Sequence, residues 1–168
     1  MAEPLRLLVV CLGNICRSPM AEGVLRARIE ASPLAGRVEV DSAGTGDWHV
    51  GDPPDRRAIA TAREHGIDIA GLRARQIGRD DHHDFDWLLC ADRNNLRDVR
   101  ARAPEAARAR TALLLEWAGI DGEIEVPDPY TGGPAQFEHV HRLLDAAANG
   151  VIERLLRGET VAAGPRQG

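Results

Sequence analysis

The sequence predicts an α/β fold in which helices cover both faces of a four-stranded parallel sheet. Short apolar runs with β-branched residues, typical of buried strands, alternate along the chain with segments whose apolar residues recur at helical spacing. Strands that alternate with helices usually pair in parallel, because each helix provides the crossover to the next strand. The 168 residues are enough for one domain of ordinary size.

The first predicted strand and helix are joined by a short polar loop. Leu5–Cys11 ("LRLLVVC") is an apolar run that stops before Gly13 and predicts a buried strand. In the segment that follows, Ser18 is a candidate N-cap, Pro19 a candidate first helical residue, and Glu22 is placed to support the first turn. The apolar residues that then recur at helical spacing are Met20, Val24, Leu25 and Ile29.

Three more strands and three more helices are predicted downstream. The strand candidates are Arg37–Thr45, which breaks at Gly44, Phe85–Asp92 and Arg110–Trp117. The helix candidates are Asp55–His65, a segment that begins near Arg93 and is interrupted near Pro104, and Pro134–Arg157. One face of the last helix is apolar and consists of Phe137, Val140, Leu143, Leu144, Ala147, Val151, Ile152 and Leu155.

These elements predict a three-layer sandwich of the flavodoxin-like or Rossmann-like type. In such sheets ligands bind beyond the carboxyl ends of the strands, where the loop that follows the first strand lies. We assign residues 1–157 to a single domain. The Gly-rich residues 158–168 are expected to form a flexible C-terminal tail.

The composition disfavours several classes of protein. A net charge of −5 and a pI near 5.7 disfavour a non-specific nucleic-acid binder. No apolar stretch approaches the roughly 20 residues of a membrane span and no secretory signal is visible, so we expect a cytoplasmic protein. Export without a classical signal peptide stays open. Three cysteines are too few for a disulfide framework, and no His/Cys spacing suits zinc, so we expect neither a metal nor a cofactor.

The loop "CLGNICRS" (residues 11–18) has the features of an anion site. Its backbone N–H groups and the positive end of the following helix would attract a negative charge. Gly13 allows a positive φ, and Asn14 tolerates the left-handed region better than most residues. The planar guanidinium of Arg17 matches two oxygens of a tetrahedral oxyanion.

Cys11 lies at the base of this loop and is a candidate nucleophile. The helix N-terminus and Arg17 would stabilise a thiolate, and the same groups would bind a phosphate. Ser18 offers a hydroxyl to the sulfur. The alternative is a cysteine that only ends a strand, beside an arginine on the helix surface. The pattern Cys-x5-Arg-Ser between a strand and a helix, with Gly and Asn inside, favours the functional interpretation.

A phosphoryl transfer through cysteine also needs a proton donor for the leaving oxygen. Asp128, in "VPDPYTGG" (residues 126–133), is the candidate because its two flanking prolines would hold it rigidly. The alternative is an ordinary turn aspartate, which is common beside proline.

The motifs together resemble a known family. "VCLGNICRSPMAE", "DSAGTGDWHVG", "ARQI", "FDWLLCADRNN" and "DPYTGG" closely resemble, in this order, the low-molecular-weight protein tyrosine phosphatases, in particular the actinobacterial ones. The resemblance runs over roughly residues 5–157. It implies hydrolysis of phosphotyrosine in proteins through a phosphocysteine intermediate, without metal or cofactor.

The resemblance implies a role for each site residue. Cys11 would form the phosphocysteine, Arg17 would bind the phosphate, and Asp128 would protonate the leaving tyrosine and then activate water. Trp48 and Tyr130 would enclose the phosphotyrosine ring. The other loop residues that would face the phosphate are Leu12, Gly13, Asn14, Ile15, Cys16 and Ser18.

The resemblance also implies supporting contacts, with two departures from the family pattern. Asn14 would hold the loop through hydrogen bonds to Ser18 and Ser42. Leu72 stands where many relatives have His, so the network around Asn14 is expected to differ. Thr131 stands where many relatives have a second Tyr, so regulation by phosphorylation of two tyrosines cannot be carried over.

Cys16 has two interpretations. It would form a reversible disulfide that protects Cys11 from over-oxidation, or it would be a small buried apolar residue.

Other functions on the same fold are alternatives. A protein arginine phosphatase would have Thr where Ile15 stands, and an arsenate reductase would need two downstream cysteines where only Cys90 exists. A non-catalytic phosphotyrosine-binding module would lack the nucleophile, the arginine or the acid. The expected partners are phosphotyrosine-containing proteins, with inhibition by phosphate and other oxyanions, no nucleic acid, no membrane and a monomeric state.

Overall fold

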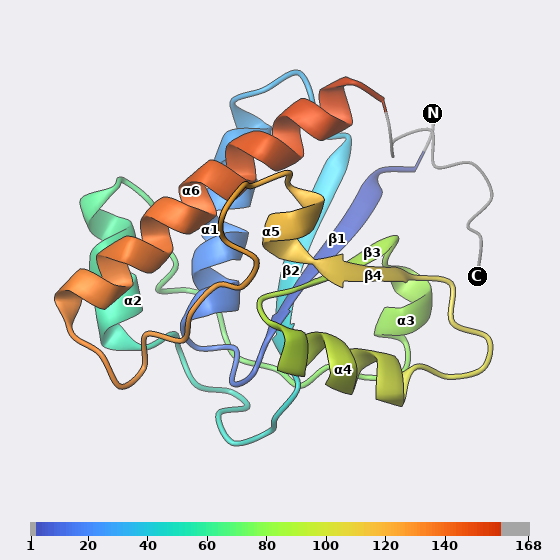
Figure 1. The fold of residues 1–168 in the computed structure, drawn as a ribbon, viewed down its shortest axis with the longest axis horizontal. Helices are drawn as coiled ribbons and strands as arrows, with labels where there is room; N and C mark the ends of the chain where they lie inside the picture. The colour runs from blue at the N-terminus through green and yellow to red at the C-terminus, as the bar shows by residue number, and fades with distance from the viewer. Residues whose placement is uncertain (1–2, 159–168) are drawn as a thin grey trace.

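Four parallel strands in the order β2-β1-β3-β4 form the centre of the computed structural model, which describes residues 3–158 (Figure 1). The strands are β1 (Leu5–Cys11), β2 (Val38–Gly44), β3 (Trp87–Cys90) and β4 (Arg110–Leu113). All three pairings are parallel. The predicted α/β class is therefore confirmed. The expected tail lies, except for Gly158, outside the described residues.

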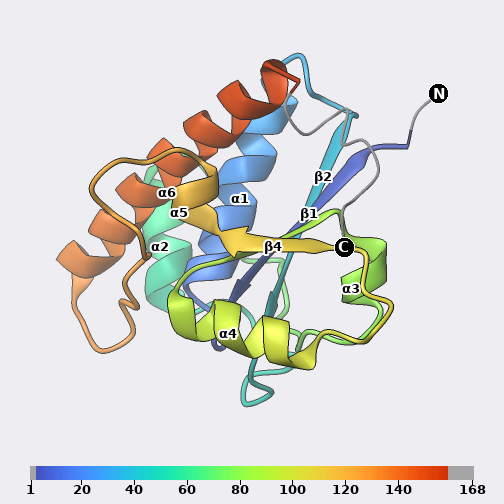
Figure 2. The ribbon, with the colours of Figure 1, turned by 45° about the vertical axis from the view of Figure 1, so that its right-hand side comes forward.

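Helices lie on both faces of the sheet, as Figures 1 and 2 show. They are α1 (Arg17–Glu30), α2 (Arg56–Glu64), α3 (Asp81–Asp84), α4 (Arg93–Arg102), α5 (Leu114–Trp117) and α6 (Pro134–Leu156). On one face, α1 packs against β1, β2 and α6, and α2 packs against α6; α4 packs against β3 and β4 on the other. In the described part of the chain, no helix is long and apolar enough to cross a membrane.

The alternation of side chains along β1 divides the core into two layers. Leu7, Val9 and Cys11 belong to the cluster formed with α1 and α6, whereas Leu8 and Val10 belong to the cluster on the opposite face. Successive strand residues point to opposite faces, so this division follows from the strand geometry. It also directs the Cys11 side chain toward α1, the helix that begins at the end of the same loop.

The fourth predicted strand is only half correct. Arg110–Leu113 is a strand, but Leu114–Trp117 forms the helical turn α5. The partner strand β3 ends at Cys90, which pairs with Leu113, so later residues have no ladder to join. The backbone groups of these residues form hydrogen bonds within the helical turn instead, such as the bond from the Ala118 N–H to the Leu114 carbonyl at 2.9 Å. An apolar run alone does not distinguish these two outcomes.

The start of α1 also differs from the prediction. The helix begins at Arg17, with Cys16 in the N-cap position and no side-chain capping bond, so Ser18 is not the cap. The Ser18 hydroxyl is used by neighbours in the loop instead. Glu22 does not support the first turn either, because its carboxylate accepts a hydrogen bond from Ser42 on β2.

Gly150 marks a close approach between α6 and the end of α5. A Cβ placed on Gly150 would lie 2.1 Å from the Ala118 carbonyl oxygen, which is backbone and cannot swing away. We predict that Gly150→Ala lowers the free energy of unfolding by about 1 kcal/mol or more, because overpacking outweighs the gain in helix propensity. Urea denaturation of the variant and the wild type measures the difference.

Gly71→Ala is the matched control, since a Cβ there would meet no described atom within 4 Å beyond its chain neighbours. Its unfolding free energy should change by less than about 0.5 kcal/mol. A Gly150→Ala protein as stable as the wild type would contradict the close packing of α6 on α5.

Candidate active site

The carboxyl ends of β1, β2 and β3 meet at one edge of the sheet, and a cavity of about 190 Å³ opens there. Three segments far apart in the chain line it: the loop after β1, the loop after β2 and the loop before α6. The lining residues are Cys11, Leu12, Gly13, Ile15, Cys16, Arg17, Trp48, His49, Asp128 and Tyr130. The structure therefore brings the candidate nucleophile, arginine and acid to one cavity.

Asn14 is the point at which the 11–18 loop turns. It has a φ of 57°, the only positive φ of a described residue other than glycine. Its Nδ2 group donates to Ser18 Oγ at 2.8 Å and to Ser42 Oγ at 3.0 Å, and its Oδ1 accepts from the Arg75 N–H at 2.9 Å. The first bond closes the loop on itself and the other two join it to β2 and to the segment at Arg75, so one buried amide fixes its shape.

Gly13 does not use the positive φ that it allows, because the left-handed turn falls on Asn14. Space is what restricts the side chain at Gly13: a Cβ there would lie 3.1 Å from His49 Cδ2. Gly44 is restricted more strongly, since its Cβ would lie 2.7 Å from the Leu12 carbonyl oxygen. The end of β2 thus lies directly against the loop.

The backbone of the loop faces two ways. Its carbonyls are held by the protein: Cys11 and Leu12 accept from Thr45 and Gly46 at 2.9 Å, and Ile15 accepts from Asp55 at 2.8 Å. Its N–H groups at positions 12–16 have no acceptor among the described residues. Buried backbone donors normally find a partner, so this row of N–H groups at a helix N-terminus is suited to an anion.

Cys11 and Ser18 are joined directly, with Sγ and Oγ 3.0 Å apart. Ser18 Oγ already accepts a hydrogen bond from Asn14, so its own hydroxyl can donate to the sulfur, with the Ala43 carbonyl at 3.5 Å as the more distant alternative acceptor.

Arg17 is the buried cation of the site, with 3% of its surface exposed. Its Nη1 donates to Asp92 Oδ2 at 2.7 Å and to the Val126 carbonyl at 3.0 Å, and its Nη2 lies 3.7 Å from Asp128 Oδ2. Burial alone would lower the pKa of Arg17, but the charges of Cys11 and Asp92 outweigh it and raise the pKa. The guanidinium is therefore permanently charged, and Asp92 and the Val126 carbonyl hold it in place.

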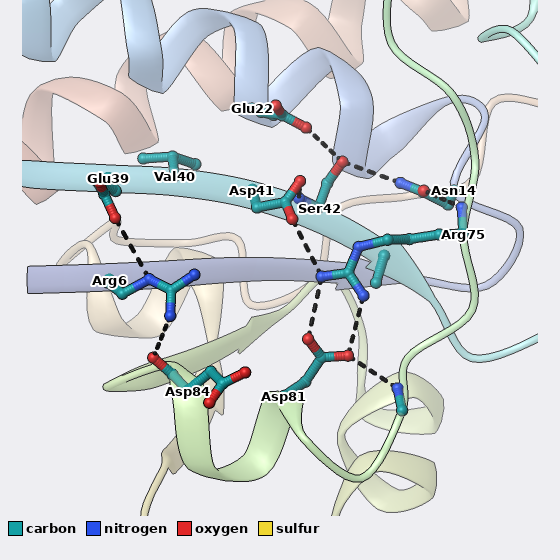
Figure 3. Close-up of polar contacts among 12 residues, drawn as sticks. Arg6, Asn14, Glu22, Glu39, Val40, Asp41, Ser42, Arg75, Asp81 and Asp84 are labelled. Carbon is teal, nitrogen blue, oxygen red and sulfur yellow. Dashed lines mark hydrogen bonds and ion pairs between the residues drawn. The ribbon is translucent and has the colours of Figure 1, made fainter.

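A second layer of polar contacts supports Asn14, as Figure 3 shows. The Ser42 hydroxyl, which accepts from Asn14, donates to Glu22 Oε1 at 2.6 Å. Arg75, whose N–H holds Asn14, extends its guanidinium to Asp41 and Asp81 at 3.0–3.1 Å. The Arg75 N–H, and not a side chain at position 72, therefore donates to the amide oxygen of Asn14. Leu72 is half-buried and packs on the apolar core.

Asp128 lies across the cavity from the 11–18 loop. Its side chain is 46% exposed, and its Oδ1 accepts from the Tyr130 N–H at 3.1 Å. Trp48 and Tyr130 stand at the mouth with 68% and 51% of their surfaces exposed. Two exposed aromatic rings beside a deep polar floor form a slot suited to a flat aryl group that carries an anion.

Cys16 is buried beside the cavity, and all three cysteines are free thiols. Burial, followed by the charge of Asp55, raises the pKa of Cys16 above its ordinary value. Its disulfide with Cys11 stays a prediction. Within residues 3–158, no group of three or more His, Cys, Asp or Glu side chains is arranged to hold a metal ion.

Three residues near the site were not predicted from the sequence. Asp92 holds Arg17 and caps α4, and a signal for it existed, because it follows the carboxyl end of β3. His49 lines the cavity next to Trp48. Arg57, in the first turn of α2, donates to carbonyls of the 126–133 loop, and no sequence pattern pointed to it.

Comparison with known sequences points to one family. Residues 6–161 match the family model described as low molecular weight phosphotyrosine protein phosphatase. The low molecular weight phosphotyrosine protein phosphatase of Schizosaccharomyces pombe is 40% identical over 151 residues, which cover 89% of this chain and 96% of that protein. Low molecular weight protein-tyrosine phosphatase A of Mycobacterium tuberculosis is 40% identical over 161 residues, which cover 94% and 98%.

Solved structures give the same result. The crystal structure of a protein tyrosine phosphatase from Entamoeba histolytica, with Hepes in its active site, superposes with a TM-score of 0.86 at 33% identity and covers 92% of this chain and 99% of that one. YfkJ from Bacillus subtilis gives a TM-score of 0.86 at 34% identity, with coverages of 94% and 98%. The likeness thus extends over nearly the whole fold.

The left-handed turn at Asn14 can be separated from its hydrogen bonds. Asn14→Gly and Asn14→Ala both remove the amide, but only Ala has a Cβ that opposes a positive φ. We predict that Asn14→Ala is less stable than Asn14→Gly by about 1 kcal/mol, after allowance for the greater freedom of unfolded Gly. Urea denaturation measures both, and an Ala variant at least as stable as the Gly variant would contradict the turn at this position.

Glu22 predicts a specific pH dependence of stability. Burial raises the pKa of its carboxyl, more than the bonds from Ser42 and Arg26 lower it. A raised pKa means that the folded state holds the proton more tightly, so the stabilising contribution exists at low pH and is lost as the pH rises through the folded pKa. We predict that Glu22→Gln gains stability relative to the wild type between about pH 4 and pH 7.

Glu30→Gln, at an exposed position of the same helix, controls for the change in charge. Chemical denaturation at several pH values provides the measurement. A stability difference between Glu22→Gln and the wild type that is flat with pH, or that falls as the pH rises, would be inconsistent with a strained buried carboxyl.

Proposed function

The chain belongs to the low molecular weight phosphotyrosine protein phosphatase family, and from this premise we propose how its site hydrolyses phosphotyrosine. The observation that supports the proposal is the single cavity lined by the Cys11 thiol, the buried Arg17 and Asp128. These are a nucleophile, a cation and a carboxyl, the three groups that phosphoryl transfer through cysteine requires.

In the first step, the Cys11 thiolate attacks phosphorus and the bond to the tyrosine oxygen breaks. The N–H groups of the 11–18 loop and the guanidinium of Arg17 hold the three equatorial oxygens, where charge is concentrated in the transition state. Asp128 gives its proton to the departing phenol oxygen. The hydroxyl of Ser18 stabilises the sulfur before the attack and after its release.

In the second step, Asp128 acts as the base. It takes a proton from a water molecule, which attacks phosphorus and releases inorganic phosphate, while Cys11 leaves as the thiolate. The same loop binds the product, so phosphate and other tetrahedral oxyanions should inhibit competitively.

The substrate preference follows from the depth and walls of the cavity. A phosphotyrosine ring between Trp48 and Tyr130 can bring its phosphate to Cys11, which phosphoserine is too short to do. Ile15 offers no polar group to the guanidinium of a phosphoarginine. Cys90 lies within β3, fully buried, and burial raises its pKa to about 12, which does not suit the relay of an arsenate reductase.

The biological setting is proposed from the same features. The partners are phosphotyrosine-containing proteins, without nucleic acid or membrane, and the protein acts as a monomeric single domain over residues 1–157. The expected location is the cytoplasm. Cys16 acts, in this proposal, as a reversible partner that protects Cys11 from over-oxidation.

The test compares two variants on two substrates. Cys11→Ser should abolish turnover but retain binding of inorganic phosphate. Asp128→Asn should slow hydrolysis of phosphotyrosine by about 10²–10⁴-fold, because general acid catalysis is lost, but should slow 2,4-dinitrophenyl phosphate much less, since its leaving group needs no proton. Both losses are measured as kcat/KM, which reports the first step only, because in the second step Asp128 acts as the base for both substrates.

Phosphoserine and phosphoarginine serve as control substrates and should be hydrolysed poorly by the wild type. Equal losses of Asp128→Asn on both aryl substrates would refute the assigned acid. Turnover that survives in Cys11→Ser would refute the nucleophile.

A further inference from the structure

The first turn of α2 contains an ion pair that the mechanism above does not use. Asp55 caps the helix, accepting the Arg57 N–H at 2.8 Å. Its carboxylate also accepts from Arg57 Nε at 3.1 Å and from Nη2 at 3.0 Å. These contacts with Arg57, chiefly the side-chain bond, lower the pKa of Asp55. The guanidinium is thus fixed in one orientation by a two-point contact.

The remaining donors of Arg57 reach the loop of the candidate acid. Nη2 donates to the carbonyl of Tyr130 at 2.9 Å and Nη1 donates to the carbonyl of Gly132 at 3.1 Å. The guanidinium carbon also lies 4.6 Å from the ring centre of Phe137 on α6 and 5.6 Å from that of Tyr130. Arg57 therefore bridges α2 to both the 126–133 loop and the start of α6.

The other end of this bridge is joined to the nucleophile's loop. The N–H of Asp55 donates to the carbonyl of Ile15 at 2.8 Å. Tyr130, whose carbonyl Arg57 holds, donates its own N–H to Asp128 Oδ1 at 3.1 Å. A continuous set of hydrogen bonds therefore runs from the 11–18 loop through Asp55 and Arg57 to the proposed acid.

We propose that Arg57 is a positioning residue that holds the 126–133 loop over the nucleophile, and so sets where Asp128 delivers its proton. The inference rests on the proposed function of Asp128. Asp128 is half exposed and its two flanking prolines donate no backbone hydrogen bond. Arg17 holds the Val126 carbonyl before Asp128, whereas the residues after Asp128 are tied to the rest of the protein through Arg57. The carbonyl contacts of Arg57 provide such a tie and leave the phosphate-binding groups untouched.

An arginine is required for this geometry. The planar guanidinium has donors in fixed directions and binds two carbonyls and a carboxylate at the same time. The single ammonium group of lysine cannot do this. Arg57→Lys should therefore keep the charge and part of the contact to Asp55 but lose at least one carbonyl, giving an intermediate effect.

The experiment measures how the defect depends on the leaving group. Arg57→Gln should lower kcat/KM for phosphotyrosine by about 10- to 100-fold, as expected for a displaced catalytic group. For 2,4-dinitrophenyl phosphate, kcat/KM should change by less than about threefold, because the first step then needs no proton. The inhibition constant of inorganic phosphate should stay within about twofold of the wild-type value, because the 11–18 loop is intact.

Two controls separate positioning from stability. Arg56→Gln removes the same charge from an exposed neighbour in the same turn and should leave both substrates unaffected. Circular dichroism and urea denaturation establish that each variant is folded, and Arg57→Lys provides the graded case if Arg57→Gln is unstable. Equal losses on both substrates in the folded variants would reduce Arg57 to a structural residue and overturn the proposal.

A double-variant cycle separates this proposal from the proposed function. If Arg57 acts through Asp128, then Arg57→Gln should add less than about threefold to the phosphotyrosine defect of Asp128→Asn. Multiplicative defects would overturn the positioning role. If Asp128→Asn itself shows no dependence on the leaving group, the acid assignment fails, and that failure is visible without any Arg57 variant.

Discussion

The buried amide of Asn14 is the constraint on which the site depends. Asn14 turns the chain in the left-handed region, and its amide donates to Ser18 and Ser42 and accepts from the Arg75 N–H. The loop therefore keeps one shape without a ligand. The loop carbonyls are then bonded outward, and the N–H groups are left for an anion. Ser18 is oriented by the same amide, so nucleophile and anion site share one support.

Charge balance is the second organising feature. Arg17 is almost completely buried, and such a cation is tolerated only beside partners that offset the loss of water. Asp92 and the Val126 carbonyl hold it from one side, while Cys11 and Asp128 face it from the other. An incoming phosphate replaces water near a cation that is already oriented, so little reorganisation is needed on binding.

The fold class was predictable because strand and helix periodicities are local and strong, and Cys11, Arg17 and Asp128 were predictable because each lies in a distinctive motif. The wrong prediction at Ser18 arose because a serine hydroxyl can either cap a helix or bond to other side chains. Ser18 has the composition of a cap, but the sulfur and Asn14 compete for its hydroxyl. No local sequence pattern indicated Arg57, because the carbonyls that it contacts lie more than seventy residues further along the chain.

The order of the site along the chain has a consequence for biosynthesis. The 11–18 loop emerges from the ribosome before Asp128 and before α6, which covers α1. β1 also waits for β3 to complete its pairing. A nascent chain therefore contains the Cys11 thiol well before it contains the proposed proton donor and the helix that packs behind α1. Turnover of phosphotyrosine at this site has to wait until Asp128 and α6 have been synthesised.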